Sequence, residues 1–279
     1  HYLVISSLLW IAIASAILFG GIWIWNKFAE KSQDDGITEQ DDDAVFLGEE
    51  VKTEKAVALK QSFRTMHAQV IGTTNAGKTE SVILPMAIQD IKNGSGVLII
   101  DGKSDSDFLD KLYAYAKKYD RAGDFKMFSL VNVPCSSSFN PLRGNNPQEV
   151  TERVFSSFKF ESEYYKNIQY RVFLSIVRLI FSHNEVPTFA LVYKLLTDTE
   201  ELSRWVENCK EEPLAKELAR FLKLTEKERE ERTSGLETMI SHFISAEVAP
   251  LFQETDESID FAEALAEGQI LYFQIPTML

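Results

Sequence analysis

Two glycines separated by four residues, and followed directly by a lysine and a threonine, occupy Gly72–Thr79. Glycines let a loop curl so that successive backbone N–H groups face one point, where they can bind a phosphate. Lys78 would then reach the β- and γ-phosphates of a nucleotide, and the Thr79 hydroxyl would ligate Mg²⁺. The pattern predicts a site for ATP and Mg²⁺ made by Gly72, Thr73, Thr74, Asn75, Ala76, Gly77, Lys78 and Thr79.

A phosphate-binding loop of this kind needs a strand before it and a helix after it. Residues 67–71 predict a short strand, and residues 80–91 carry apolar side chains at roughly helical spacing. Pro85 either kinks this helix or marks the end of its first turns, and Asn93–Gly94 should close it. The alternative is an ordinary glycine turn with a surface lysine, but the strand–loop–helix order favours nucleotide binding.

An acidic residue ends the next predicted strand, VLIID at 97–101. Four apolar residues in a row are typical of a parallel strand that is buried on both faces. Ligands bind at the carboxyl ends of such strands, so Asp101 could hold the Mg²⁺ shell. The alternative is a supporting role, with the metal-shell acid on a later strand, and spacing alone leaves both interpretations open.

The rest of the chain predicts an α/β core interrupted by helices. Residues 105–121 predict an amphipathic helix, 124–133 a strand and 139–142 a loop. Helical periodicity then continues through 147–158, 162–182, 187–197, 199–211, 213–223, 226–248 and 258–266, and residues 269–275 return to a strand pattern. We therefore expect the first part of a nucleotide-binding domain at 51–145, an all-helical insertion at 146–266, and a return strand at 267–279.

The first residues of the chain are strongly apolar, and residues 2–25 carry no charge. At ~1.5 Å per residue, a helix of this length crosses a hydrocarbon core of ~30 Å. Residues 1–26 are therefore predicted to be a transmembrane helix, with Lys27 and Lys31 favouring a cytoplasmic side after it. A cleaved signal peptide and a buried core helix are the alternatives. Residues 27–50 predict an acidic, solvated cytoplasmic linker.

Charge and cysteine content restrict the possible partners and compartment. The net charge of −13 disfavours nucleic acid, unless basic residues gather in one groove. The stretch 159–178 mixes tyrosines with lysine and arginine and could stack on bases, although a bundle helix with its apolar side inward is favoured. Cys135 and Cys209 suggest neither a disulfide framework nor a metal site, which fits a reducing compartment.

In this order, these features resemble the type IV secretion coupling proteins, which are hexameric inner-membrane ATPases of the RecA/FtsK-like class. HAQVIGTTNAGKTE looks like the phosphate loop (Walker A) of that family, although Asn75 and Ala76 stand where Gly-Ser is usual. VLIIDGKSD at 97–105 is similar to the family's D-P-K-G-[DE] segment at Asp101, Lys103 and Asp105, but departs from it at 102 and 104. The loop FNPL at 139–142 and the segment AEALAEGQILYFQIPTML also resemble the family.

The resemblance covers essentially the whole chain and looks most like the type IVB (Dot/Icm) branch of DotL (IcmO) and TrbC. It implies a RecA/FtsK-like P-loop core with an inserted all-α domain, and ATP bound between the subunits of a hexamer. It also implies a bacterial inner-membrane location, with effector protein substrates, adaptors and other secretion-system membrane proteins as partners. Nucleic acid is possible but not favoured.

In the family, the hydrolytic acid pair lies on a later strand, which we expect beyond Leu279. This implies a supporting role for Asp101, and no hydrolysis by the present fragment alone. The competing functions are a DNA translocase, either conjugative or of the chromosome-partitioning type, and a nucleotide-binding scaffold that does not hydrolyse.

Overall fold

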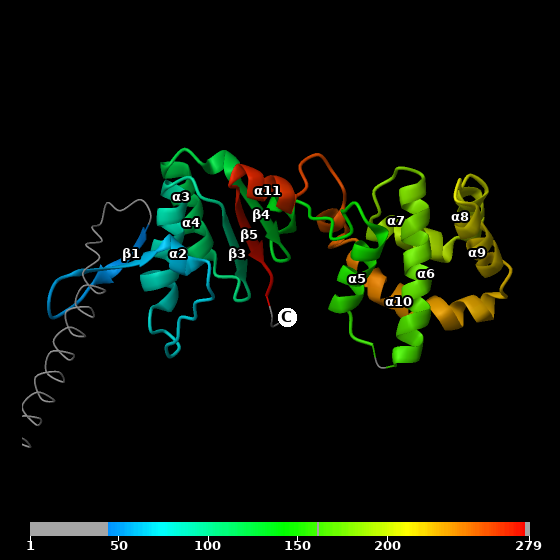
Figure 1. Cartoon of the computed structure of the whole chain (residues 1–279), viewed down its shortest axis with the longest axis horizontal. Helices are drawn as coiled ribbons and strands as arrows, with labels where there is room; N and C mark the ends of the chain where they lie inside the picture. The colour runs from blue at the N-terminus through cyan, green and yellow to red at the C-terminus, as the bar shows by residue number, and fades with distance from the viewer. Residues whose placement is uncertain (1–43, 161, 277–279) are drawn as a thin grey trace, which may run out of the picture. The chain divides into compact units, whose positions relative to one another are not determined.

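The computed structural model describes residues 44–160 and 162–276 (Figure 1). The predicted transmembrane helix at 1–26 and the linker up to residue 43 lie outside these described residues. Among the residues that are described, no helix is both long enough and apolar enough to span a bilayer. The chain divides into two compact units, His1–Asn93 and Gly94–Leu279.

The first unit contains an antiparallel hairpin of β1 (Ala44–Glu49) and β2 (Ala56–Lys60), with a bulge between Phe46 and Gly48. The short helix α2 (Gln61–Arg64) follows. The hairpin corrects the prediction of a solvated linker through residue 50, because residues 44–49 form a strand. The physical reason is the pairing of β1 with β2 and the burial of Ala44 and Val45, which fix this segment despite the acidic run before it.

The strand predicted at 67–71 does not form, and this segment is irregular and exposed. Val70 is 38% and Ile71 83% exposed. An apolar run becomes a strand only where a neighbouring strand pairs with its backbone groups, and β-propensity alone does not supply that neighbour. The loop at Gly72–Thr79 is followed by a π-helical turn, η1 (Thr79–Ile83), and by α3 (Leu84–Lys92). As predicted, Asn93 and Gly94 close the helix: Asn93 caps α3, and Gly94 is left-handed with φ +78°.

The second unit contains a parallel sheet of β3 (Val97–Asp101), β4 (Phe125–Ser129) and β5 (Ile270–Gln274). The strand order is β3-β5-β4, so the strand that comes last in the chain lies between the other two (Figure 1). This confirms that the chain returns to the sheet at the predicted strand 269–275. The sheet places the carboxyl ends of all three strands at one edge, with Asp101 opposite Gln274 and Ser129 opposite the same residue.

Strand β3 differs from the sequence prediction in its burial. Leu98 is 53% and Ile100 69% exposed, whereas the apolar run predicted a strand buried on both faces. In the β3-β5-β4 order β3 is an end strand, and α4 (Ser106–Lys118) contributes the buried side chains Phe108, Leu112 and Ala116. Central β5 is buried at every position, as a strand paired on both sides should be.

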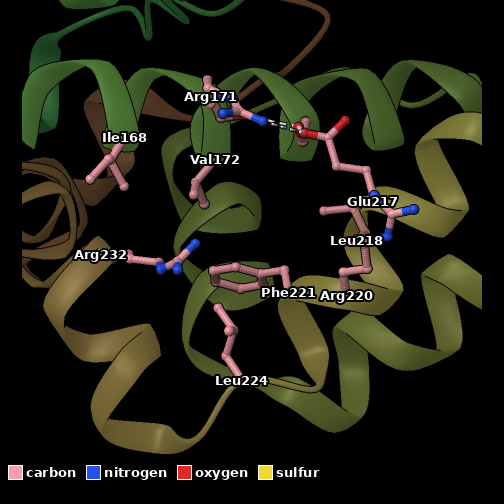
Figure 2. A pocket seen from close by; sticks show the side chains of 10 residues that line it. Ile168, Arg171, Val172, Glu217, Leu218, Arg220, Phe221, Leu224 and Arg232 are labelled. Carbon is pink, nitrogen blue, oxygen red and sulfur yellow. Dashed lines mark hydrogen bonds and ion pairs between the residues drawn. The ribbon is translucent and has the colours of Figure 1, made fainter.

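Six helices form a bundle with its own core: α5 (Pro147–Ser157), α6 (Glu163–Ser182), α7 (Phe189–Thr197), α8 (Thr199–Glu207), α9 (Glu212–Leu222) and α10 (Glu226–Ile244). The predicted helices are confirmed to within a few residues, and the largest differences are that α8 ends at Glu207 rather than at 211 and α10 at Ile244 rather than at 248. A 3₁₀ turn, η4 (Ala249–Phe252), follows and contains Pro250, which cannot continue the helix. A pocket opens among α6, α9 and α10 (Figure 2).

The helix before the return strand packs with the sheet. Ala264 of α11 (Phe261–Glu267) belongs to a cluster with Phe128, Leu271 and Phe273 of the sheet. Leu251 and Ile259, from the segment that leads to α11, complete this cluster. The bundle core is a separate cluster that draws its buried side chains from α5 to α10 and from Leu142.

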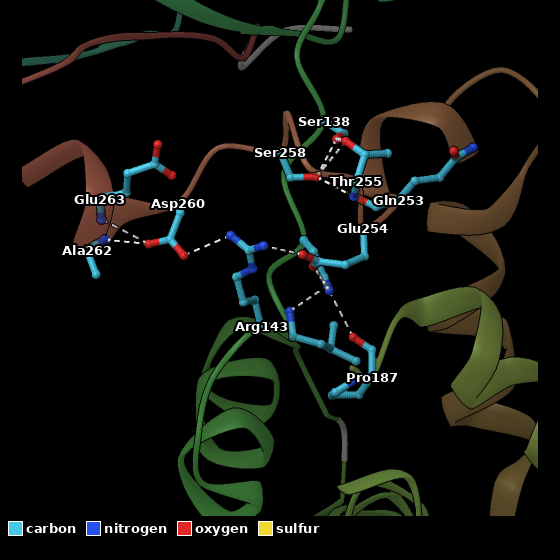
Figure 3. Close-up of polar contacts among 12 residues, drawn as sticks. Ser138, Arg143, Pro187, Gln253, Glu254, Thr255, Ser258, Asp260, Ala262 and Glu263 are labelled. Carbon is cyan, nitrogen blue, oxygen red and sulfur yellow. Dashed lines mark hydrogen bonds and ion pairs between the residues drawn. The ribbon is translucent and has the colours of Figure 1, made fainter. Parts of the chain in front are cut away.

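Polar contacts join the segment that enters the bundle to the segment that leaves it (Figure 3). Arg143 bonds the carboxylates of Glu254 at 2.5 Å and Asp260 at 2.8 Å. The Asn140 amide donates to the Pro187 carbonyl at 2.9 Å and to Glu254 at 2.7 Å. Asn140 lies in the predicted loop at 139–142, which is confirmed as irregular chain. These bonds hold the segment that leads from the sheet into the bundle against the segment that leads back from the bundle to the sheet.

Candidate functional site

The loop Gly72–Thr79 lies at the surface of the first unit, with Gly72–Ala76 exposed and the last three residues half-buried. Asn75 has φ +62° and Gly77 φ +76°, both in the left-handed region. The Ala76 N–H closes a turn by donating to the Thr73 carbonyl at 3.2 Å. Left-handed residues within a short loop curl the backbone and bring N–H groups to one side, which is the form of an anion-binding concavity.

Lys78 folds back over the start of this loop. Its Nζ donates to the carbonyl oxygens of Gly72 and Thr73, at 2.7 Å in each case. A Cβ at position 72 would lie 3.3 Å from Cγ and Cδ of Lys78, which is closer than most packed carbon atoms come. Glycine at 72 therefore leaves room for the lysine stem, and the ammonium brings a positive charge beside the loop backbone.

The second glycine of the pattern is needed for two reasons. Its left-handed φ of +76° is costly for any residue with a Cβ, and a Cβ there would lie 3.1 Å from Oγ of Ser81. The Gly77 carbonyl accepts a hydrogen bond from the Ser81 N–H at 2.7 Å, which starts the helical turns. Gly77 thus joins the curled loop directly to the helix.

The helix begins with a π turn rather than an α turn. The Leu84 N–H donates to the Thr79 carbonyl, five residues back, and α-helical bonding takes over in α3. Pro85 is in the first turn of α3, where its missing N–H costs least. Pro85 lies directly after the π turn, at the second residue of α3, which is where the first turns end.

Two side chains near the far end of α3 fix this helix against the hairpin and α2 of the same unit. The Gln89 amide pairs with both backbone groups of Phe46 in β1, accepting from its N–H at 2.8 Å and donating to its carbonyl at 2.9 Å. The Asp90 carboxylate, which is largely buried, binds both terminal nitrogens of Arg64, at 2.6 and 2.5 Å. Sequence reasoning missed both residues, because their partners lie 43 and 26 residues away.

Asp101 lies at the carboxyl end of β3 in the second unit, where its carboxylate accepts three hydrogen bonds. Oδ1 accepts from the Lys103 N–H at 2.8 Å, and Oδ2 accepts from the Asp105 N–H at 2.7 Å. The Tyr272 hydroxyl, on the neighbouring strand β5, also donates to Oδ2 at 2.7 Å. The carboxylate therefore joins β3, β5 and the turn that leads into α4.

The protonation equilibria of this pair follow from the same contacts. Partial burial is the largest single influence on Asp101 and opposes its ionisation. The hydrogen bonds that it accepts, from Tyr272 first and then from backbone N–H groups of the following turn, together outweigh burial, so the pKa of Asp101 is lowered. Burial first, and then the bond to Asp101, raise the pKa of Tyr272 well above that of a free phenol. Asp101 is thus a stable anion that donors of the second unit surround.

The loop residues from Gly72 to Thr79 are brought together by their adjacency in the chain, while Asp101 belongs to the other compact unit. Tyr272 is the residue of the Asp101 site that sequence reasoning missed, because nothing local signals that the last strand pairs beside β3. Within the described residues, no group of three His, Cys, Asp or Glu side chains could hold a metal ion.

In the aromatic stretch of α6, Tyr164 and Tyr165 are exposed and contact each other edge to face at 5.5 Å. Tyr170 is half-buried against Phe155, and its hydroxyl accepts from the Gln148 amide. Ile176 and Ile180, about two and three turns further on, are fully buried. This arrangement is the bundle helix that the sequence favoured, with exposed tyrosines only in its first turn.

Comparison with known proteins gives one distant relative. No family model matches this chain. Over 121 residues the chain is 26% identical to type 4 coupling protein DotL of Legionella pneumophila, a match that covers 40% of this chain. It covers only 15% of DotL, so the similarity concerns a small part of that protein. The chain is therefore distantly similar to a type IV coupling protein, in a fold of mixed α/β type with a parallel sheet.

Proposed function

We propose that this chain is part of a type IV secretion coupling ATPase, with a RecA/FtsK-like P-loop core into which an all-α domain is inserted. The observation that carries the proposal is the similarity to DotL in a chain that also contains the curled loop Gly72–Thr79. The parallel sheet, with a helical bundle inserted before its central strand, supports the same architecture.

The loop residues fit a nucleotide phosphate chain. The left-handed Asn75 and Gly77 curl the backbone, and Gly72 leaves space that a Cβ would take from Lys78. In the proposal, Lys78 exchanges its two carbonyl acceptors for phosphate oxygens, which bind an ammonium more strongly because they are charged. The Thr79 hydroxyl holds Mg²⁺, and the positive end of the following helix favours the anion.

ATP, when bound, supplies the free energy of phosphoanhydride hydrolysis. The chain's own contribution at this loop is to bind and orient the phosphates, since Lys78 and the backbone N–H groups neutralise their charge. Asp101 supports the start of α4, in keeping with the three protein donors that already surround it. The remaining parts of the proposal are a hexameric ring anchored in the bacterial inner membrane, effector proteins as substrates, and adaptor proteins as partners.

The proposal is tested by substrate export from cells that carry the full protein with Lys78→Ala. Export should be abolished while the amount of protein in the membrane fraction is unchanged, because the loop keeps its fold and loses its phosphate contact. Lys92→Ala is the matched control, since Lys92 is an exposed lysine in the last turn of the same helix. Normal export by the Lys78 variant, or equal loss in both variants, would refute the proposal.

A further inference from the structure

An apolar pocket of about 320 Å³ lies where the sheet and the bundle meet within the second unit. Seven of the side chains that line it are phenylalanines, and they come from the strands, from the bundle and from the segments that connect the two. Phe128 and Phe273 belong to β4 and β5, and Phe189 and Phe243 belong to α7 and α10. This junction pocket is therefore a product of the tertiary fold and not of one element.

The aromatic rings of the junction pocket contact one another in a continuous series. Phe189 stacks on Phe243 with ring centroids 4.3 Å apart, and Phe243 meets Phe252 edge to face at 5.0 Å. Phe252 contacts Phe128 at 5.8 Å, and Phe128 contacts Phe273 at 5.4 Å. Such contacts between rings add to the stability gained by burial, so they fix the shape of the wall. The wall offers ring faces and edges to a planar apolar ligand.

Arg153 of α5 is the charged residue among those that line the junction pocket, and it also lines a neighbouring pocket. Its Nη1 donates to the carbonyl oxygens of Pro141 and Arg143, at 2.9 Å in each case, which holds the guanidinium in place. Its Nη2 and Nε form no hydrogen bond with any residue that the structure describes, and Arg153 forms no ion pair there, although Glu149 precedes it by one turn. Two donors of a fixed guanidinium therefore remain available.

The carboxylate that lines the neighbouring pocket, that of Asp260, has other partners (Figure 3). It accepts from the N–H groups of Ala262 and Glu263, at 2.8 and 3.2 Å, where α11 begins. It also binds the Arg143 guanidinium at 2.8 Å. Asp260 is thus held at the start of α11 and leaves the Arg153 donors open to the carboxylate of a ligand.

The size and the charge of the junction pocket together indicate a class of ligand. An apolar cavity of ~150 Å³ holds one benzene molecule, so a pocket of about 320 Å³ has room for two fused rings. A neutral hydrocarbon would leave Nη2 and Nε of Arg153 without an acceptor. A carboxylate accepts from both at once, because its two oxygens match the planar fork of the guanidinium.

We propose that the junction pocket binds a small aromatic carboxylate, whose rings lie against Phe128 and Phe243 and whose carboxylate accepts from Nη2 and Nε of Arg153. The inference goes beyond the proposed function, because none of the residues that line the pocket belongs to the loop Gly72–Thr79. A ligand bound here contacts both the sheet and the bundle, so it should stabilise their junction by mass action.

Calorimetric titration of the full protein with 2-naphthoate, and with naphthalene-2-carboxamide as its uncharged analogue, tests the proposal. The unaltered protein should bind 2-naphthoate at least roughly tenfold more tightly, because a charged acceptor strengthens both hydrogen bonds. Arg153→Gln should remove this preference, with 2-naphthoate bound roughly tenfold more weakly and the carboxamide within about twofold of its original affinity. Arg153→Lys should keep part of the preference, because it keeps the charge but loses the fork.

Two neighbouring serines of α5 provide a matched pair of variants that locates the site. Ser156 and Ser157 both donate to the Arg153 carbonyl, at 2.9 and 3.0 Å, but of the two only Ser157 lines the junction pocket. Ser157→Trp should place an indole in the pocket and abolish binding of 2-naphthoate. Ser156→Trp loses the same hydrogen bond and should bind normally. Partition of the ligand into detergent is the same for every variant, so a difference between variants reports the protein.

Hydrogen exchange, read by mass spectrometry with and without 2-naphthoate, shows whether the ligand acts at the junction. Amides of η4 and of the last turn of α10 should exchange more slowly with ligand, whereas amides of α8 should not change. Exchange in α6 reports whether each variant has kept the fold of the bundle, and the Arg153 variants test the proposal even if Ser157→Trp does not fold.

Four results would overturn the inference. They are absence of binding to the unaltered protein, equal affinity of that protein for the two ligands, unchanged binding by a folded Ser157→Trp, and equal loss of both ligands in Arg153→Gln. The last result would mean that Arg153 only holds the loop at Pro141 and Arg143 in place.

Discussion

The contact between Tyr272 and Asp101 offers a quantitative test of the sheet and of the role of Asp101. Tyr272 is fully buried, and its hydroxyl donates to a carboxylate oxygen at 2.7 Å. Tyr272→Phe removes this hydrogen bond and keeps the ring in place. A hydrogen bond to a charged group contributes about 1.5–3 kcal/mol, and Asp101 keeps its two N–H donors, so we expect a loss near the lower end, about 1.5 kcal/mol.

Asp101→Ala should cost more, because it leaves the buried Tyr272 hydroxyl and the N–H groups of Lys103 and Asp105 without their acceptor. We expect about 3 kcal/mol, since both N–H groups lie in an exposed turn and regain water. In the double variant the two losses should not add, and the coupling free energy between the side chains should be about 1–2 kcal/mol.

Hydrogen exchange, read by mass spectrometry, measures these losses where they occur. In the full protein, amides of β3 and β5 should exchange roughly tenfold faster in Tyr272→Phe and roughly a hundredfold faster in Asp101→Ala. Amides of α6 in the bundle core serve as the internal control and should not change. Unchanged exchange in Asp101→Ala together with loss of Mg²⁺-dependent ATP binding would refute the supporting role and assign Asp101 to the metal shell.

Three further predictions follow from particular contacts. Because the pKa of Asp101 is lowered in the fold, its contribution to stability should be complete above its ordinary pKa of about 4 and disappear as pH falls through the lower folded value. The difference in unfolding free energy between the unaltered protein and Asp101→Asn, measured from about pH 7 down to about pH 2, should therefore shrink in acid, and a constant difference would contradict this. Gly77→Ala should weaken ATP binding at least roughly tenfold, because the left-handed φ and the Ser81 contact both oppose a Cβ. Gly123→Ala is the control, since a Cβ at position 123 meets no atom within 4 Å. Unchanged ATP affinity of Gly77→Ala by calorimetry would show that the loop tolerates a side chain. Arg143→Ala should destabilise the junction of sheet and bundle by about 2 kcal/mol, because it leaves two partly buried carboxylates, Glu254 and Asp260, without their cation. Limited proteolysis near residue 254 should therefore be faster in the variant. Equal rates in the variant and the unaltered protein would contradict a stabilising role of Arg143 at this junction.

Elements whose evidence is local were predictable from the sequence. Apolar periodicity located every helix of the bundle, and the run at 269–275 located β5, because burial of one helix face or of a short strand leaves a direct pattern. The glycine spacing located the loop at 72–79, since its backbone needs glycine where φ is +76°. Pro85 was expected to kink the helix or to mark the end of its first turns, because it lacks an N–H to donate, and it lies directly after the π turn.

Features that depend on distant partners were not predictable. The hairpin at 44–49 was assigned to a linker, because the acidic run before it concealed the pairing with β2. The strand expected at 67–71 did not form, since an apolar run does not by itself provide a neighbouring strand. The partner of Asp101 was missed for the same reason, as Tyr272 lies 171 residues further along the chain. The transmembrane helix expected at 1–26 lies outside the described residues and stays a prediction.

The measurement that tests the central claim most directly is calorimetric titration of the complete, detergent-solubilised protein with ATP and Mg²⁺, compared with Lys78→Ala and with Lys92→Ala. We predict binding to the unaltered protein and to Lys92→Ala, and at least a roughly hundredfold loss in Lys78→Ala, because the loop loses the ammonium that contacts the phosphates. Equal ATP affinity in all three proteins would contradict the account, and Gly72–Thr79 would then be a glycine turn that carries a surface lysine.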